Sequence, residues 1–328
     1  MWALAPTAGE FLRRGCACRL EALRTRRVAG DAPRDASTIR RGRCLRDDPW
    51  MPHRALTSAE ISLPAHPDTA RVTKRIAELA HDVEIVVLTD NHAGEARMSP
   101  LAAVALAREQ GVRTVIHVSA RDRNRLALQS QVIGAAALGC DGIVCLHGDD
   151  VPGILRVGDM TGTQLLAAAG EWLAPLPIAR GCVVNPFTTD PDRELRLLRR
   201  KLECGATFAH TQMCFSIPAL TRFMDRADEA GLLQRLRVYV TVGVLRTRAM
   251  ADRARSLPGC DLPDSAYAQV CAGGGRELAL EMAQRLADLP VVDALHVMPL
   301  GDEPTAARVA AAFRRARRVA ATHGVAGS

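Results

Sequence analysis

A carboxylate inside an apolar run is the feature of this sequence best suited to chemistry. Glu60 stands in Ala59-Glu60-Ile61-Ser62, where an unpaired carboxylate is costly to bury. Burial is expected to raise the pKa of such a carboxyl, so that it can act as a general acid near neutral pH. The alternative is a structural partner for an arginine, and the residue types alone leave both interpretations open.

Further polar side chains follow other short apolar runs. Asp149 and Asp150 come after one such run, and they predict either a negative group that faces a cationic intermediate or a cap for the next helix. Gln212 closes another run, where it could read an amide-like ring edge or cap the strand end. We interpret His117 and His147, on adjacent runs, as neutral core histidines unless a ligand uses them.

An alternating basic run has two interpretations. Arg121, Arg123 and Arg125 could grip a carboxylate or a phosphate. They could equally form a salt-bridged loop with Asp122 that leads to a helix capped by Asn124. We favour the structural interpretation.

Eight strand-like runs separated by helical patterns must position these side chains. Such alternation predicts βαβ units, and eight units indicate a single closed (βα)8 barrel of the α/β class over residues 56–322, with its active site at the carboxyl ends of the strands. Typical helical segments are Pro100–Glu109, Asn124–Leu138, Asp192–Glu203 and Ile217–Ala230. The expected strands are Ala59–Leu63, Glu84–Leu88, Thr114–Val118, Gly142–Leu146, Gly181–Val184, Thr207–Thr211, Val238–Val242 and Ala294–Met298.

One long connection interrupts this alternation. The segment from Arg246 to Leu289 is expected to hold two helices and a loop around Gly273-Gly274-Gly275. This loop could cradle a phosphate at a helix N-terminus, but a plain turn is the favoured interpretation. An open dinucleotide-binding sheet is the alternative fold, and its GxGxxG turn is missing.

Composition and charge exclude several classes of protein. Residues 1–50 hold 11 arginines and 6 acids, whereas the other 278 residues carry a net charge of only +2. The first fifty residues are therefore expected to be a poorly ordered, dispensable extension, and the nearly neutral remainder argues against a nucleic-acid partner. No apolar run approaches the roughly 18 residues of a membrane span.

The ten cysteines show no CxxC pair, so they are interpreted as reduced, mostly buried thiols of a cytoplasmic protein. No metal site is predicted, and self-association into a homo-oligomer is left open. Lysine occurs only at positions 74 and 201, against 41 arginines, so each lysine is a candidate for a role that arginine cannot fill.

Several motifs in order resemble bacterial methylenetetrahydrofolate reductases over about residues 57–300. They are Glu60-Ile61-Ser62, Leu88-Thr89-Asp90-Asn91, Ile116-His117-Val118 with Arg121-Asp122-Arg123-Asn124, Ala127-Leu128-Gln129-Ser130, Leu146-His147-Gly148-Asp149-Asp150, Val184-Asn185-Pro186-Phe187, and Lys201-Leu202-Glu203-Cys204-Gly205-Ala206 before His210-Thr211-Gln212. Each motif alone is weak, but seven in order are specific.

The resemblance implies a flavoprotein that reduces 5,10-methylenetetrahydrofolate to 5-methyltetrahydrofolate with NAD(P)H. It implies that Glu60 is the general acid and that Asp149 stabilises the cationic intermediate. Asp149 and Gln212 would hold the pterin, with Phe215 as a candidate to stack on the substrate. The positions expected beside the FAD are Thr89, His117, His147, Gly148, Asn185 and Lys201.

Three departures from the family pattern concern the flavin. The turn from Asp150 to Gly158 is short, His147 stands where Thr or Arg is common, and few aromatic residues are available for stacking. FAD is therefore expected to bind weakly, and a divergent reductase that works without it is one alternative. A folate-dependent methyltransferase without redox chemistry and a catalytically inactive scaffold are the others.

Overall fold

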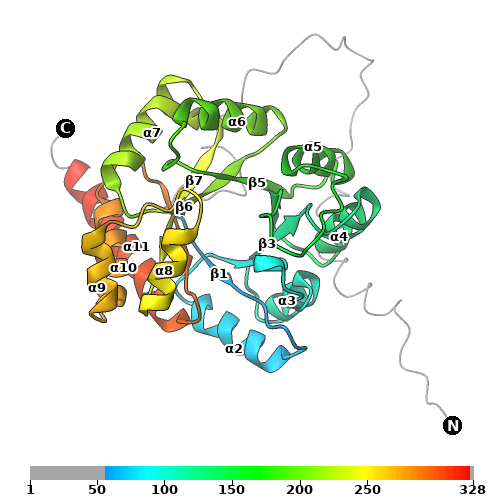
Figure 1. The fold of residues 1–328 in the computed structure, drawn as a ribbon, viewed down its shortest axis with the longest axis horizontal. Coiled ribbons are helices and arrows are strands. Elements are labelled where there is room, and N and C mark those ends of the chain that lie inside the picture. Colours follow the sequence, from blue (N-terminus) through cyan, green and yellow to red (C-terminus); the bar gives the residue numbers. More distant parts are fainter. Residues whose placement is uncertain (1–55, 326–328) are drawn as a thin grey trace. The chain divides into compact units, whose positions relative to one another are not determined.

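Eight parallel strands form a closed ring in the computed structural model, which describes residues 56–325 and the side chains of residues 57–319. The last strand pairs with the first, and the helices lie outside the ring (Figure 1). The predicted (βα)8 barrel is therefore confirmed. The strands are β1 (Leu56–Ile61), β2 (Ile85–Leu88), β3 (Thr114–Ser119), β4 (Gly142–Leu146), β5 (Ala179–Val184), β6 (Phe208–Met213), β7 (Arg237–Gly243) and β8 (Ala294–Met298).

The strand sequences are apolar because both faces of each strand are covered. All four residues of β2 are buried, for example. One hydrophobic cluster fills the inside of the ring toward the amino-terminal ends of the strands. A larger hydrophobic cluster lies between the strands and the helices. β1 begins three residues before the expected Ala59, because closure pairs Leu56 with Ala294 of β8. The inner cluster contains Ile85, Val87, Val115, Val144, Phe208, Tyr239 and Ala294.

The helices cover the ring with their apolar sides, and most match the expected segments. The side chain of Asn124 accepts a hydrogen bond from the backbone N–H of Ala127, so the predicted cap is confirmed. The helices before the long connection are α2 (Thr69–Ala80), α3 (Pro100–Glu109), α4 (Arg125–Ala137), α5 (Gly162–Trp172), α6 (Pro191–Glu203) and α7 (Ile217–Glu229).

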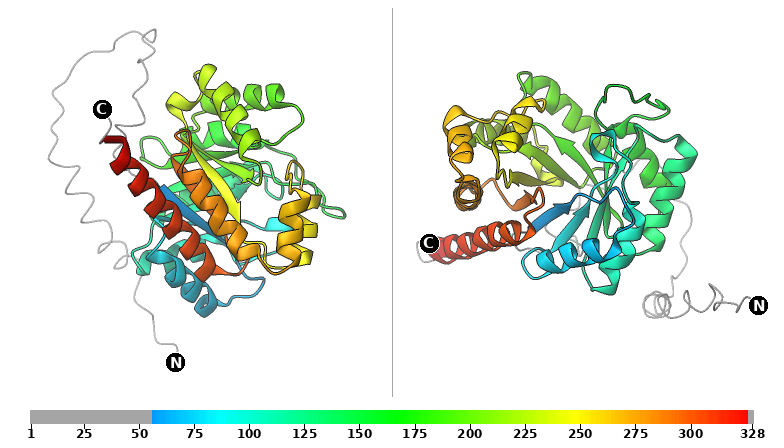
Figure 2. Two further views of the ribbon diagram at one scale, coloured as in Figure 1. Left: turned by 90° about the vertical axis from the view of Figure 1, so that its left-hand side faces the viewer. Right: turned by 60° about the horizontal axis from the view of Figure 1, so that its bottom comes forward.

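The long connection holds three helices, so the expectation of two was wrong. They are α8 (Arg248–Ser256), α9 (Asp264–Cys271) and α10 (Gly275–Ala287), and they lie together between α7 and α11 (Glu303–Val325) (Figures 1 and 2). The glycine loop is a turn between α9 and α10, as favoured. Gly275 must lack a side chain, because a Cβ there would lie 1.7 Å from the carbonyl oxygen of Leu245.

The seven cysteines of the described part are free thiols, and only Cys271 is exposed. Burial raises the pKa of Cys140 and of Cys182 to about 11, which agrees with inert thiols. Between residues 56 and 325 no helix is long and apolar enough to cross a membrane. The expectation of a dispensable extension over residues 1–50 concerns residues outside the described part of the chain.

Candidate active site

A cavity of about 710 Å³ opens at the carboxyl ends of the strands, where a barrel enzyme is expected to carry its active site. Eight of the ten predicted site residues line this cavity, which is called the mouth cavity below. They are Glu60, His117, His147, Gly148, Asp149, Asn185, Lys201 and Gln212.

Glu60 lies near the end of β1 and is 8% exposed. Its Oε2 is 3.7 Å from Nε2 of His296 on β8. The other ring nitrogen of His296, Nδ1, is 2.9 Å from the hydroxyl oxygen of Ser58, which fixes the orientation of the imidazole. Ser58 and His296 are register partners in the β1–β8 pair, so closure of the barrel creates this contact.

The environment of Glu60 differs from the one expected from the sequence. Burial by itself would raise the pKa of the Glu60 carboxyl. The interaction with His296 and the positive charges that His296, His117 and His92 can carry outweigh burial, so the pKa is lowered. The expectation of a raised pKa was wrong because the histidine partner lies on the last strand, far away in sequence.

Two further histidines complete a buried group beside Glu60. The ring of His210 stacks on His296 with centroids 4.2 Å apart and planes 11° apart. Burial lowers the pKa of His117, and burial with the charges of His296 and His117 places the pKa of His210 well below its ordinary value. Both histidines are therefore neutral near pH 7, as expected for His117. Nε2 of His117 has no hydrogen-bond partner among the described residues, so it is available to a ligand.

The segment after β4 is exposed rather than part of the core. His147 is exposed, so its interpretation as a core histidine was wrong. Asp149 and Asp150 do not cap a helix either, because α5 begins at Gly162 and Thr161 supplies its cap. Asp150 pairs instead with Arg156, which leaves Asp149 exposed at the cavity.

The backbone of this segment requires glycine at position 148. It has a φ of +81°, and a Cβ would lie 2.5 Å from the hydroxyl oxygen of Ser119. A side chain at this position would therefore deform the entrance between β3 and β4.

Two polar side chains of the mouth cavity already have protein partners. Nε2 of Gln212 donates to the carbonyl oxygen of Pro258 at 3.2 Å, and Oε1 accepts from the N–H of Met213 at 3.0 Å. Nζ of Lys201 donates to the carbonyl oxygen of Val183 at 2.7 Å and lies 3.9 Å from Oε1 of Glu194. A ligand that uses either group has to share or replace these contacts.

The two remaining predicted residues lie outside the cavity lining. Thr89 is buried, and its hydroxyl bonds the backbone of Ile61 and Leu63. Phe215 packs in the apolar cluster around β7 and α8–α9. Their roles beside the flavin and the substrate stay predictions.

The basic run after β3 forms a salt-bridged structure, which is the interpretation that the sequence favoured. Arg121 is 4% exposed, and its Nε is 2.6 Å from Oδ1 of Asp122. Arg123 is paired at 2.7 Å with the fully buried carboxylate of Asp90. These arginines are committed to neighbouring carboxylates, so cations for a ligand must come from elsewhere.

A second cavity, of about 450 Å³, adjoins the mouth cavity between α5 and α6. Arg193 and Lys201 line both cavities, and Arg200 lines the smaller one. The N-terminus of α5 at Gly162 opens onto it as well. Three cations and a helix N-terminus suit a phosphate or diphosphate group.

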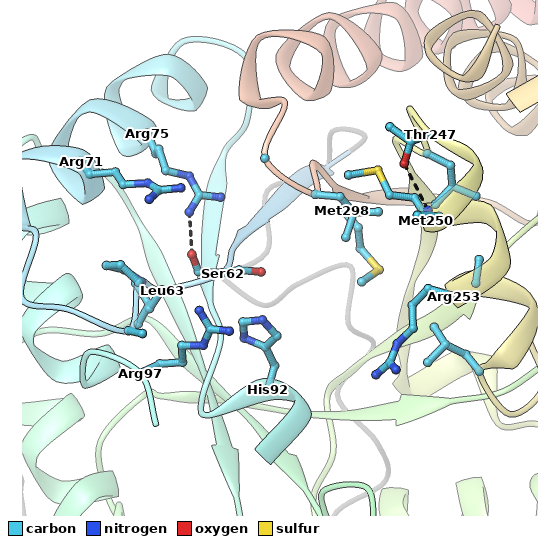
Figure 3. A pocket seen from close by; sticks show the side chains of 18 of the residues that line it. Ser62, Leu63, Arg71, Arg75, His92, Arg97, Thr247, Met250, Arg253 and Met298 are labelled. Atoms are coloured by element: carbon cyan, nitrogen blue, oxygen red, sulfur yellow. Dashed lines mark hydrogen bonds between the residues drawn. The ribbon is translucent and has the colours of Figure 1, made fainter. Parts of the chain in front are cut away.

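A third cavity, of about 810 Å³, lies over the ends of β1, β7 and β8 (Figure 3). Met298 lines both this cavity and the mouth cavity, so the two adjoin at this side chain. Ser62, Arg75 and Arg97 stand on one side of it, and Arg253 of α8 stands on the opposite side (Figure 3).

His210 and His296 were missed as site residues by sequence reasoning. Each is a polar residue within a buried strand, which is the signal that identified Glu60. His210 was noted only within a longer motif. Applied to every strand, the same criterion would have selected both histidines.

Comparison with known families decides the assignment. A family model described as methylenetetrahydrofolate reductase matches residues 51–313, which includes all eight strands. The chain belongs to this family. A search of curated proteins gives no match.

Several solved structures are similar to this reductase-family chain. An uncharacterised protein from Clostridium thermocellum that binds two copies of 5-methyl-5,6,7,8-tetrahydrofolic acid aligns with a TM-score of 0.60 and 12% identity, over 80% of this chain and 95% of that one. Tryptophan synthase from M. tuberculosis aligns at 0.48 and 18% identity, over 81% and 94%. Dihydropteroate synthase from Thermus thermophilus aligns at 0.44 and 18% identity, over 82% and 94%.

Proposed function

We propose that this protein reduces 5,10-methylenetetrahydrofolate to 5-methyltetrahydrofolate with NAD(P)H. The observation that carries the proposal is the buried Glu60–His296 pair at the cavity that Asp149 and Gln212 also line. Family membership and the folate bound by the Clostridium thermocellum protein support the substrate class.

The pair suits the proton transfer that this reaction requires. Opening of the imidazolidine ring needs a proton on the leaving nitrogen and produces a cationic iminium. Because the pKa of Glu60 is lowered beside His296, we infer that Glu60 carries this proton only transiently, as it passes the proton to the leaving nitrogen. The exposed carboxylate of Asp149 would then provide a negative potential where positive charge develops.

The residues of the smaller cavity fit a flavin dinucleotide. Arg193, Arg200, Lys201 and the N-terminus of α5 would hold its diphosphate, and His117 would present its unpaired Nε2 toward the ring system. FAD, when bound, would pass hydride from NAD(P)H to the folate. No phenylalanine, tyrosine or tryptophan of the described residues lines the mouth cavity, which agrees with weak flavin binding.

A reductase that works without flavin is the second candidate. The observation in its favour concerns Lys201, the lysine that the first candidate assigns to the flavin diphosphate. Its ammonium already bonds the carbonyl oxygen of Val183 and lies close to Glu194, so a flavin phosphate would have to compete with these contacts. The visible spectrum of the purified protein separates the two candidates. A flavin spectrum, or activity that depends on added FAD, would support the first, and full activity of a colourless protein without FAD would support the second.

Product analysis tests the function itself. We expect 5-methyltetrahydrofolate to form from 5,10-methylenetetrahydrofolate and NADH or NADPH, as measured by chromatography and mass spectrometry. If neither nucleotide supports this product, with or without FAD, the reductase assignment is wrong. Tight folate binding would then favour the methyltransferase, and its absence would favour the inactive scaffold.

A further inference from the structure

His210 is a buried polar residue of the mouth cavity to which the proposed proton transfer gives no task. It lies on β6, two residues before Gln212, and it is 5% exposed. Of the aromatic rings that surround it, the nearest is that of His296 on β8, the partner of Glu60. Any part that His210 plays at the site is therefore expected to act through His296.

The barrel brings these two rings together across an intervening strand. β6 and β8 each pair with β7 and not with one another. The register partner of His210 on β7 is Tyr239, and that of His296 is Thr241. Side chains from alternate strands of a (βα)8 barrel share a layer inside the ring, so His210 and His296 can meet there face to face.

The contacts at the edge of the His296 ring do not fix its plane. Nδ1 is 2.9 Å from the hydroxyl oxygen of Ser58, and Nε2 is 3.7 Å from Oε2 of Glu60, which is longer than a good hydrogen bond. An imidazole turns readily about its Cβ–Cγ bond, and a serine hydroxyl can rotate to follow it. The ring of His210 resists this turn because it covers one face of His296, with the two planes only 11° apart.

Two further rings hold His210 itself. Tyr239 meets it edge-on, with centroids 5.3 Å apart and planes at 75°, and Phe208 lies 5.5 Å away at 54°. Both neighbours are buried, and tilted arrangements of this kind are favourable for aromatic pairs. The packed interior of the barrel thus sets the position of His210, and His210 in turn limits the movement of His296.

His210 can support His296 without competing with it for a proton. Burial, together with the charges of His296 and His117, keeps the pKa of His210 well below its ordinary value. Two positive imidazoles with centroids 4.2 Å apart would also repel each other strongly inside the barrel. A proton on this stacked pair therefore belongs on His296, the ring that is paired with Glu60.

We propose that His210 is a positioning residue, whose stacked ring holds the imidazole of His296 in the orientation in which Nε2 faces Glu60. The inference rests on the proposed function and adds a residue to its proton transfer. It assigns the effect to the flat face of the His210 ring and not to its nitrogen atoms. Phenylalanine should therefore replace His210 at this position, whereas an aliphatic side chain should not.

Steady-state kinetics of His210→Leu and His210→Phe test the proposal. In His210→Leu we expect kcat for folate reduction to fall about tenfold or more, because small misplacements of reacting groups have effects of this size. KM for the folate should stay nearly constant, since His210 acts on the proton transfer and not on substrate binding. His210→Phe should keep most of kcat. Phe313→Leu, which removes a fully buried ring from the cluster outside the barrel, is the control for loosened packing and should keep its kcat.

The orientation of His296 can also be followed without substrate. NMR spectra that correlate the nitrogens and protons of the imidazole rings distinguish the tautomers of the nine histidines, and His296→Asn identifies the signals of His296. At about pH 8, where histidine is ordinarily neutral, we expect a single tautomer with its proton on Nε2, toward Glu60. His210→Leu should show a mixture of tautomers, and His210→Phe should keep the single form.

Three results would overturn the inference. If His210→Leu keeps its kcat, or keeps His296 as a single tautomer, stacking does not hold the ring. If His210→Phe is folded, as judged by circular dichroism, but loses as much kcat as His210→Leu, the nitrogens of His210 are required and not its face. An equal loss in Phe313→Leu would show that any loosening of the core has this effect.

Failure of the proposed function would be seen separately. An unmodified protein that forms no 5-methyltetrahydrofolate would refute the function, and the NMR comparison would still decide whether His210 holds His296. If the larger ring prevents His210→Phe from folding, the spectrum of His210→Leu decides alone. A mixture of tautomers would then support the inference, and a single tautomer would overturn it.

Discussion

Glu60 is the residue at which the proposed mechanism is most directly tested. Glu60→Gln keeps the size of the side chain and a polar contact near His296, but an amide cannot take up and deliver a proton. Folate reduction should fall by about a hundredfold or more, which is the usual scale for general acid catalysis. Reduction of FAD by NAD(P)H, followed as bleaching of the flavin absorbance, should stay nearly unchanged because that step needs no such proton.

Asp150→Asn is a matched control for this substitution. It makes the same change from carboxylate to amide on an exposed side chain that pairs with Arg156, and activity should stay near that of the unmodified protein. Loss of both half-reactions in Glu60→Gln would instead identify Glu60 as a structural or binding residue.

The buried histidines predict how stability depends on pH. Burial lowers the pKa of His117 and of His210 below the ordinary value of 6.5. As the pH falls below about 6.5, the unfolded chain binds protons at these positions while the folded chain does not, so the free energy of unfolding decreases. Glu60 acts in the same direction, but only below its ordinary value of 4.5, because its pKa is also lowered in the folded state.

Thermal melting between pH 7 and pH 5 measures this dependence. The melting temperature should fall with pH, and the fall should be shallower in His210→Phe, which keeps a ring against His296 but cannot bind a proton. His147→Gln removes an exposed histidine and should leave the slope unchanged. An identical slope in the protein and in His210→Phe would show that His210 does not carry the effect.

At the scale of elements, the contact between the start of α10 and the segment after β7 allows no side chain at position 275. Gly275→Ala would place a methyl group 1.7 Å from the backbone oxygen of Leu245, and the backbone must shift to accept it. We expect a loss of about 3 kcal/mol in the free energy of unfolding, measured with urea.

Gly134→Ala is the control for this element. Gly134 lies inside α4, and its added Cβ would meet the flexible end of Leu101 at 3.3 Å. Alanine also favours the helix by up to about 1 kcal/mol, so stability should stay within about 1 kcal/mol of the unmodified protein. Equal losses in the two variants would show that the close approach at Gly275 does not limit packing.

The helices and strands differ in how closely their limits could be predicted from the sequence. The limits of β8 were predicted residue for residue, because Asp293 and Pro299 bound a short apolar run. The separate helices α8 and α9 were not anticipated, since each is short and α8 buries only Ala251 and Ala254. Pro258, between them, was an available signal for the break.

At the scale of the whole molecule, an ion pair joins the first and last βα units. Nε of Arg75 on α2 donates to Oε1 of Glu303 on α11 at 2.7 Å, and Glu303 is 5% exposed. Arg75→Met would leave this carboxylate buried without its partner, which is expected to cost about 3–5 kcal/mol. Adding Glu303→Gln should recover most of the loss in urea denaturation.

Lys74→Met, one position earlier on α2, is the control. Lys74 is 77% exposed and only pairs with Glu78 at 3.8 Å, so the change should cost less than about 1 kcal/mol. Additive losses in the Arg75→Met/Glu303→Gln double variant would show that the two side chains contribute independently.

Closure of the barrel also explains what the sequence could not reveal about the site. A polar residue inside an apolar strand indicated Glu60, and the family resemblance indicated His117. The partner of Glu60 lies on β8, and the two meet only through the register of β1 against β8. That register depends on ring closure, which no local pattern specifies, and the sign of the pKa change at Glu60 depended on it.

The hydrogen bond from Gln212 to the carbonyl oxygen of Pro258 makes attachment of a loop compete with binding of a ligand at Gln212. Pro258 lies in the loop between α8 and α9, and α8 carries Arg253. A ligand that takes the N–H of Gln212 now bonded to Pro258 must break this contact with the loop, and by thermodynamic reciprocity anything that loosens the contact favours that ligand to the same extent. If Gln212 holds the pterin as proposed, the loop is an internal competitor for that position, and its sequence would influence folate affinity without contact with the folate.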